Sequence, residues 1–157
     1  MPTPFQIRRA TRDDAARFAE GRLALFREMS DLAEGPDHDA LLRDTRDVFA
    51  DQIARGATLA WLALDAAGHV VGSVALHVFE RLPSVSNRVP FEAYVSHVWV
   101  ASAWRRRGVG RALMDALAAE ARARGAQRIR LHATEPGRKL YEALGYRLRS
   151  NDMELRL

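Results

Sequence analysis

Residues 105–111 combine arginines and glycines in the short run RRRGVGR. Glycines at 108 and 110 remove side chains where the chain turns, so successive backbone N–H groups can converge on one anion. An amphipathic helix is predicted to begin at Gly108, and a helix N-terminus adds roughly half a positive charge. The arginines around the glycines are Arg105, Arg106, Arg107 and Arg111. This combination predicts a binding site for a pyrophosphate group.

Two common nucleotide-binding patterns do not fit this run. A P-loop requires a Gly-Lys pair followed by serine or threonine, and the chain contains no Gly-Lys pair. The dinucleotide-binding pattern G-x-G-x-x-G requires a third glycine, where this chain has Leu113. The pattern that remains is R-x-x-G-x-G, from Arg105 to Gly110, between an apolar strand and a helix.

Hydrophobic periodicity and turn residues predict the elements that position this run. Alternating or continuous apolar stretches predict strands at 5–9, 58–64, 70–79, 91–100 and 129–132. Helical spacing and end signals predict helices at 15–29, 36–56, 108–124 and 136–144. Thr11 and Asp14 fit a capping box at the start of the first helix. A hairpin that turns at 150–152 is predicted within residues 146–157.

These elements predict one mixed α/β domain over residues 1–157, without a linker or an internal repeat. Its length of 157 residues suits one domain, and 48% hydrophobic with 28% charged residues is typical of a globular chain. The chain has no cysteine, which excludes disulfides and cysteine-rich zinc sites, and no H-x-x-x-H pair, so we predict no metal. No apolar run approaches the ~18 residues of a membrane span, and the N-terminus lacks the apolar core of a signal peptide. We therefore expect a cytoplasmic protein without membrane contact.

A second motif lies downstream, in the run LHATEPGRKLYEALGY at residues 131–146. Together with R-x-x-G-x-G at residues 105–110, it resembles the GNAT superfamily of N-acetyltransferases, in which the first motif is the acyl-CoA pyrophosphate loop. The predicted order of elements agrees along nearly the whole chain. The resemblance implies a GNAT-like acyl-CoA N-acyltransferase fold, with a central mixed, mostly antiparallel sheet whose middle strands splay apart and are flanked by helices.

The resemblance also implies where acetyl-CoA binds. Its pantetheine would lie between strands 91–100 and 129–132 and pair with the backbone like an added strand. A backbone N–H near Val98 to Val100 would face the thioester oxygen and stabilise the charge that develops there. Many relatives carry asparagine and alanine where this chain has Thr134 and Gly137, which indicates a subgroup. The residues implied in cofactor binding are Val98, Trp99, Val100, Arg105, Arg106, Arg107, Gly108, Val109, Gly110, Arg111, Thr134, Gly137, Arg138 and Tyr141.

Three residues are predicted to take part in catalysis. Tyr141 corresponds to the family tyrosine near the sulfur of coenzyme A, and a phenol with a pKa of about 10 can donate a proton to the departing thiolate. The amine must lose a proton, and the nearby bases are Glu92 and His97. Strand alternation predicts that these two side chains lie on opposite faces, so at most one of them faces the acceptor.

The leading hypothesis is an enzyme that transfers acetyl from acetyl-CoA directly to a primary amine of a small molecule or peptide. The alternatives are a catalytically silent acyl-CoA sensor and a nucleic-acid-binding module, although no aromatic residue except Trp104 lies among the arginines to stack on bases. We expect no nucleic acid partner, and a homodimer is possible. An acidic stretch could attract a cationic amine or simply be solvated; its acidic residues are Glu28, Asp31, Glu34, Asp37 and Asp39.

Overall fold

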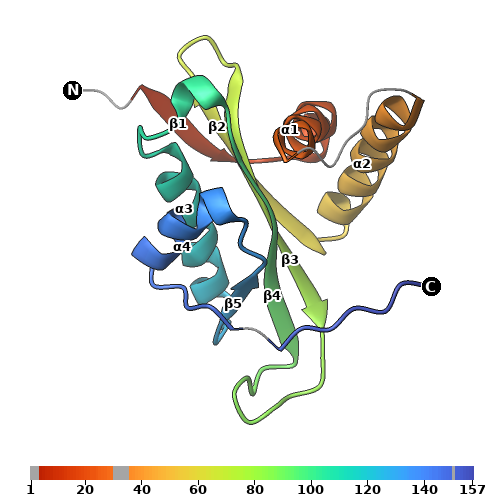
Figure 1. The fold of residues 1–157 in the computed structure, drawn as a ribbon, viewed down its shortest axis with the longest axis vertical. Coiled ribbons are helices and arrows are strands. Elements are labelled where there is room, and N and C mark those ends of the chain that lie inside the picture. The colour runs from red at the N-terminus through yellow and green to blue at the C-terminus, as the bar shows by residue number, and fades with distance from the viewer. Residues whose placement is uncertain (1–3, 30–35, 150) are drawn as a thin grey trace.

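The computed structural model describes residues 4–29, 36–149 and 151–157 of the chain (Figure 1). At its centre is a five-stranded sheet in the order β1-β2-β3-β4-β5. Neighbouring strands are antiparallel except β4 and β5, which are parallel. The strands are β1 (Phe5–Arg9), β2 (Thr58–Asp65), β3 (Val70–Glu80), β4 (Phe91–Val100) and β5 (Ile129–Leu131). The predicted mixed, mostly antiparallel sheet is thus confirmed.

Helices cover both faces of this sheet (Figure 1). One face carries α1 (Ala15–Glu28) and α2 (Pro36–Ala54), and the other carries α3 (Val109–Ala123) and α4 (Arg138–Ala143). An apolar cluster fills each interface, with Leu113 of α3 in one and Phe18 of α1 in the other. No helix in the described ranges is both long and apolar enough to cross a membrane.

A buried carboxylate determines where the first helical segment begins. The backbone N–H of Thr11 donates to Oδ2 of Asp14 at 2.8 Å, and the two residues form the predicted capping box. Arg8 and Arg17 each form an ion pair with Asp14 at 2.8 Å. The hydrogen bond from Arg8, together with both positive charges, holds the pKa of Asp14 well below its usual range. This network connects β1 to the start of α1.

A β-bulge interrupts the pairing of β4 with β3. Leu76 pairs with Val95 and Ala75 pairs with His97, so Ser96 has no partner in β3. One extra residue in a strand moves every following side chain to the opposite face. The bulge therefore determines toward which face of the sheet each side chain in the C-terminal half of β4 points.

The prediction that Glu92 and His97 lie on opposite faces is wrong, and the bulge is the reason. Ala93, before the bulge, and Val98, after it, both pack beneath α3. The neighbours of these residues, Glu92 and His97, therefore both point toward the opposite face, which α1 and α2 partly cover. The extra residue Ser96 interrupts the alternation of side chains between Glu92 and His97.

The predicted C-terminal hairpin is also wrong within the described residues. Residues 146–149 and 151–157 form no strand. Met153, Leu155 and Leu157 alternate with polar residues, but all three are exposed. Alternation alone does not form a strand, because an isolated hairpin is at most marginally stable and needs a neighbouring strand or helix to pack against.

Candidate active site

A cleft opens where β4 and β5 separate. β5 pairs with β4 only from Ala93 to Val95, and no described strand pairs with that edge of β4 beyond Val95. The cleft has a volume of about 760 Å³ and is lined by α1, the end of β4, the loop before α3, and α4. Its lining residues are Leu25, Glu28, Met29, Val98, Trp99, Val100, Trp104, Arg105, Arg106, Gly108, Val109, Gly110, Arg111, Thr134, Pro136, Gly137, Leu140 and Tyr141.

The N-terminus of α3 forms the cationic end of this cleft. Gly108 caps the helix in the left-handed conformation, with φ of 81°, and Arg106 also has a positive φ, of 60°. The first N–H bonded within this helix belongs to Ala112, which donates to the carbonyl of Gly108 at 3.0 Å. The preceding N–H groups of α3 are therefore available to an anion, and the helix dipole favours negative charge at this end.

Arg105 connects this loop to α1 across the cleft. Its Nε donates to the carbonyl of Val100 at 3.0 Å, and its Nη2 forms an ion pair with Glu28. Arg105 and Glu28 are both exposed, so solvent screens their attraction and the pair is weak. A phosphate entering the cleft can therefore compete with Glu28 for the guanidinium of Arg105.

Two glycines allow α4 to approach the rest of the cleft closely. A Cβ atom at Gly110 would lie 3.1 Å from Cδ2 of Leu140, which is tighter than ordinary contact. A Cβ atom at Gly137 would lie 2.9 Å from the ring of Tyr141 and 3.3 Å from its hydroxyl oxygen. Larger residues at these positions would displace the tyrosine ring or open the helix contact, so both glycines shape the cleft.

Tyr141 is buried in α4, and its ring packs edge-on against Tyr146 at 6.0 Å between centroids. Burial, with a smaller contribution from Tyr146, raises the pKa of Tyr141 to about 12. The phenol is therefore fully protonated at neutral pH and can act only as a proton donor there. Because it also lines the cleft, the proton it carries is available to a group bound in that space.

Two of the residues predicted to bind the cofactor lie outside this lining. Arg107 lies over the ring of Trp104, with 5.3 Å from its Cζ to the ring centroid. Arg138 donates from Nε to Oε1 of Glu142 at 2.9 Å. The other predicted cofactor residues all line the cleft.

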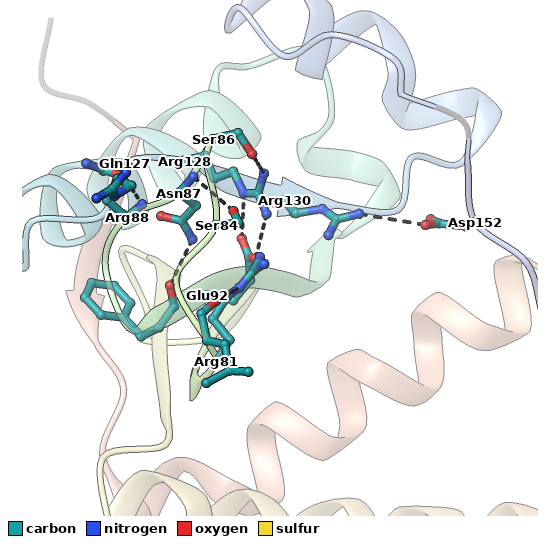
Figure 2. A network of polar contacts seen from close by, with 12 residues as sticks. Arg81, Ser84, Ser86, Asn87, Arg88, Glu92, Gln127, Arg128, Arg130 and Asp152 are labelled. Carbon is teal, nitrogen blue, oxygen red and sulfur yellow. Dashed lines mark hydrogen bonds and ion pairs between the residues drawn. The ribbon is translucent and has the colours of Figure 1, made fainter.

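Glu92 is buried between two arginines at the other end of β4. Figure 2 shows its carboxylate facing the guanidinium groups of Arg81 and Arg128. Arg128 donates to both carboxylate oxygens, at 3.2 and 3.0 Å, and Arg81 donates to one of them. Burial would raise the pKa of Glu92, but the hydrogen bonds from Arg128 and Arg81 outweigh it and lower that pKa. An ionised carboxylate with its oxygens engaged in this way is a weak base, and it holds β4 to the segment before β5.

His97 is fully enclosed on the α1 side of the sheet. Its Nε2 lies 2.8 Å from the hydroxyl of Ser73, and its ring packs against Phe18 at 4.7 Å between centroids. Burial and the positive charge of Arg22 lower the pKa of His97 to about 3. The imidazole is therefore neutral, and neither His97 nor Glu92 lines the cleft.

A second cavity lies on the opposite face of β4, between α1, α2 and β3. Its volume is about 360 Å³, within the range of small-molecule sites. Ser96, at the bulge, lines this cavity, and Val98 lines the cleft, so both spaces border one short piece of β4. The lining residues are Phe18, Arg22, Phe26, Leu41, Asp44, Thr45, Val48, Phe49, Gln52, Thr58, Ala75, His77 and Ser96.

A chain of hydrogen bonds orients His77 in this second cavity. The hydroxyl of Thr58 donates to Oε1 of Gln52 at 2.6 Å. That hydroxyl has one proton, so at its 2.7 Å contact with Nδ1 of His77 it must accept. Nδ1 therefore carries the imidazole proton, and Nε2 accepts a hydrogen bond from the hydroxyl of Ser96. Burial, and to a lesser extent the charge of Arg22, lower the pKa of His77, so the ring is a neutral acceptor.

The sequence analysis did not identify His77, Ser96 or Arg22 as functional residues. His77 and Ser96 are 19 residues apart, and only the antiparallel pairing of β3 with β4 brings them together. Of the acidic residues predicted near an acceptor, Asp31 and Glu34 lie outside the described residues, and Asp37 and Asp39 are exposed in the first turn of α2. No local sequence signal indicated the contact of His77 with Ser96.

Comparisons with known sequences and with solved structures agree on the family and on the fold. The sequence profile of the acetyltransferase (GNAT) family matches residues 23–146. No curated protein sequence matches the chain. A solved GCN5-related N-acetyltransferase from Ralstonia eutropha JMP134 is 28% identical, with a TM-score of 0.86 and 98% of both chains covered.

Two further solved structures share the fold. A predicted acetyltransferase with acetyl-CoA from Clostridium acetobutylicum is 20% identical, with a TM-score of 0.85 and coverage of 97% of this chain and 96% of that one. The aminoglycoside acetyltransferase HMB0005, from an uncultured soil metagenomic sample, is 24% identical, with a TM-score of 0.73 and 98% of both chains covered. At these identities the likeness establishes the fold and not the substrate.

Proposed function

Because the chain belongs to the acetyltransferase (GNAT) family, we propose that it transfers an acetyl group directly from acetyl-CoA to a primary amine. The observation that carries this proposal is the cleft beside β4, which combines a cationic helix N-terminus at one place with a protonated, buried tyrosine at another. An anionic cofactor with a reactive sulfur matches both features.

The cleft residues suit an acyl-CoA. The N–H groups at the start of α3 and the guanidinium groups of Arg105, Arg106 and Arg111 are donors for a pyrophosphate. Beyond Val95, the edge of β4 pairs with no described strand and offers backbone groups to the amides of pantetheine. When bound, acetyl-CoA would supply the acetyl group as an activated thioester.

Tyr141 is the proposed general acid. In the transfer, the nitrogen–carbon bond of the product forms and the carbon–sulfur bond breaks, which leaves a thiolate that needs a proton. Tyr141 keeps its proton at neutral pH and lines the cleft near Gly137, so it can supply that proton. A backbone N–H near Val98 is proposed to stabilise the negative charge on the acetyl oxygen.

His77 is the proposed proton acceptor on the other side of β4. The amine must lose one proton as it forms its bond to carbon, and neither Glu92 nor His97 lines the second cavity. The hydroxyl of Ser96 lies at the bulge and donates to Nε2 of His77. The hydroxyl of Ser96 can therefore give its proton to Nε2 of His77 and take up the proton that the amine loses, so that one proton moves in total from the amine to His77.

Release of free thiol from acetyl-CoA tests this function. A panel of primary amines that includes amino acids, polyamines, aminoglycosides and peptide N-termini is mixed with the protein, and thiol release is followed against a heat-denatured control. We expect release to depend on the amine. If acetyl-CoA stabilises the protein against heat but no amine in the panel releases thiol, the enzyme proposal fails and a silent acyl-CoA sensor takes its place.

A further inference from the structure

Arg22 is a half-buried cation that faces the second cavity. Its Nη1 donates to the carbonyl of Ser96 at 3.2 Å, and its guanidinium lies over the ring of Phe26, 4.8 Å from the centroid. Among residues 4–29, 36–149 and 151–157, no carboxylate lies within ion-pair distance of it. One carbonyl and one aromatic face leave most of its five N–H donors without a partner from these residues.

The other arginines enclosed by the described structure are neutralised. Arg8 pairs with Asp14, and Arg81 and Arg128 pair with Glu92. Removing a cation from water is costly unless an anion compensates for it. For Arg22, burial is the cause that lowers its pKa, with no opposing contribution from an acidic neighbour. A guanidinium in this setting can bind an anionic group of a ligand.

We propose that the acceptor amine carries a carboxylate next to the amino group and that Arg22 binds this carboxylate. This inference rests on the proposed transferase function, and it narrows the acceptor to the class of α-amino acids. A carboxylate on Arg22 places the adjacent amino group beside Ser96, because Arg22 is itself bonded to the carbonyl of Ser96. The amine is then next to the piece of β4 that also borders the cleft, in which the acetyl group would lie.

The remaining walls of the cavity indicate an apolar side chain on this amino acid. Phe18 and Phe49 stack at 4.0 Å between centroids, and Phe26 lies beneath Arg22. Leu41 and Val48 of α2 extend these apolar walls, and the polar residues His77 and Ser96 lie on the side of the sheet. Asp44 is the acidic residue of the described lining, and it is exposed. A polycationic acceptor would find little compensation here, whereas an amino acid with an aromatic or aliphatic side chain would bury apolar surface.

Binding of a carboxylate would also make His77 a better base. The charge of Arg22 contributes to the lowered pKa of His77. When a carboxylate neutralises Arg22, that contribution shrinks and the pKa of His77 rises toward its ordinary value. The base would therefore strengthen only when an acceptor of the right class is bound.

Matched acceptors test the inference. Phenylalanine, phenylalaninamide and phenethylamine share one side chain but differ in the group beside the amine. We expect kcat/KM for phenylalanine to exceed that for each of the others by about tenfold or more, the range of a charge-assisted hydrogen bond. Arg22→Gln should remove this preference by raising KM for phenylalanine, and Arg22→Lys should restore part of it. Arg43→Gln, which removes an exposed charge from α2, is the matched control and should keep the preference.

Equilibrium binding separates this inference from the transferase function. Thermal shifts with phenylalanine and with phenylalaninamide are compared in wild type and Arg22→Gln, and the shift with acetyl-CoA verifies that the variant is folded. Selective stabilisation by phenylalanine that Arg22→Gln abolishes supports the inference even if no thiol is released, and in that case only the transferase proposal fails. If amines are acetylated with no preference for the carboxylate, or if Arg22→Gln keeps the preference, the inference is overturned and the transferase proposal stands.

Discussion

The hydroxyl of Tyr141 gains its proposed role from burial. Its ring lies between α4 and the core, over Gly137, and no hydrogen bond to another described residue holds its hydroxyl. Burial raises its pKa to about 12, so protonation does not limit its use as an acid at any pH below about 11. Removing the hydroxyl should therefore affect chemistry without leaving a buried polar partner unsatisfied.

Tyr141→Phe should lower kcat by about 100-fold, the lower range for loss of a general acid. The thermal stabilisation by acetyl-CoA should be retained, because the phenyl ring still fills the space. Tyr94→Phe is the matched control, since Tyr94 lies outside the cleft, and it should retain wild-type kcat. Wild-type kcat in Tyr141→Phe would exclude the tyrosine as the acid.

The proposed proton acceptor, His77, should determine how kcat depends on pH. His77 has a pKa lowered from 6.5 by burial and by Arg22. As a base it works only when neutral, so kcat at saturating amine should fall as the pH drops below the pKa that His77 has with the acceptor bound, and should be level above it. His77→Gln should lower kcat by about 100-fold and remove this acidic limb.

His69→Gln is the control for this measurement, because His69 is an exposed residue of the β2–β3 turn. It should show the wild-type pH profile. An acidic limb that persists in His77→Gln would assign the proton acceptor to another group. Ser96→Ala should reproduce most of the loss in kcat, because it removes the hydroxyl that contacts His77 and is proposed to relay the proton of the amine.

At the scale of elements, the bulge in β4 and the short pairing of β5 produce the site together. Strands that remained paired along their whole length would leave no backbone edge for a cofactor. β5 pairs with only three residues of β4, and the bulge at Ser96 begins directly after the last of them. The bulge also directs Val98 toward α3 and leaves Ser96 on the side of α1. One irregularity thus forms both the cleft and the wall of the second cavity.

The start of α3 can be tested as an anion site. At about 100-fold excess over its Kd, acetyl-CoA should raise the Tm of wild type by about 5–10 °C. Gly110→Glu places a carboxylate among the N–H donors and a side chain against Leu140, where a Cβ atom would already lie 3.1 Å from Cδ2. We expect this variant to lose the stabilisation by acetyl-CoA.

Ala119→Glu adds the same charge to an exposed position farther along α3 and should keep the full thermal shift. This control separates the position of the added charge from its presence in the helix. A wild-type thermal shift in Gly110→Glu would remove the start of α3 from the cofactor site.

Most helices and strands could be predicted from the sequence. Each strand and helix up to α4 appeared near its predicted position because hydrophobic period, capping residues and glycine stops are local signals. The signals for the proposed pyrophosphate loop and for Tyr141 were equally local. The C-terminal hairpin was not correctly predicted within the described residues, since a strand depends on a partner and residues 146–149 and 151–157 pair with none.

At the scale of the whole molecule, the buried imidazole of His97 makes the stability of the fold depend on pH. His97 has a pKa of about 3 in the folded protein, mainly through burial, whereas in the unfolded chain it has the ordinary value of about 6.5. Between these two values the unfolded state binds a proton that the folded state does not. Acidification in this window therefore favours unfolding.

The free energy of unfolding should fall by about 1.4 kcal/mol per pH unit from His97 alone as the pH decreases from about 6.5 toward 4. Urea denaturation at several pH values measures this slope. His97→Gln should have a slope shallower by about that amount, with lower stability at pH 7 because its contacts with Phe18 and Ser73 change.

His132→Gln alters an exposed histidine and should keep the wild-type slope. If His97→Gln also keeps it, the imidazole is not held neutral by the fold. Asp14 has a pKa lowered mainly by Arg8, so its own loss of stability begins at about pH 5 and develops mostly below about pH 4. This loss is common to wild type and His97→Gln, so the difference between their slopes still reports His97.

The sequence by itself determined the order of the elements, the glycine turn with its arginines, and the tyrosine of the second motif, because each is encoded by residues that are neighbours along the chain. Only the tertiary structure decided that Glu92 is held by two arginines, that Ser96 forms a bulge, that His77 meets Ser96, and that Arg22 faces a cavity. These contacts join segments far apart in the sequence, and their geometry follows from strand register and side-chain packing. A bulge of one residue moves every following side chain of the strand to the opposite face of the sheet, so no local pattern could assign those roles.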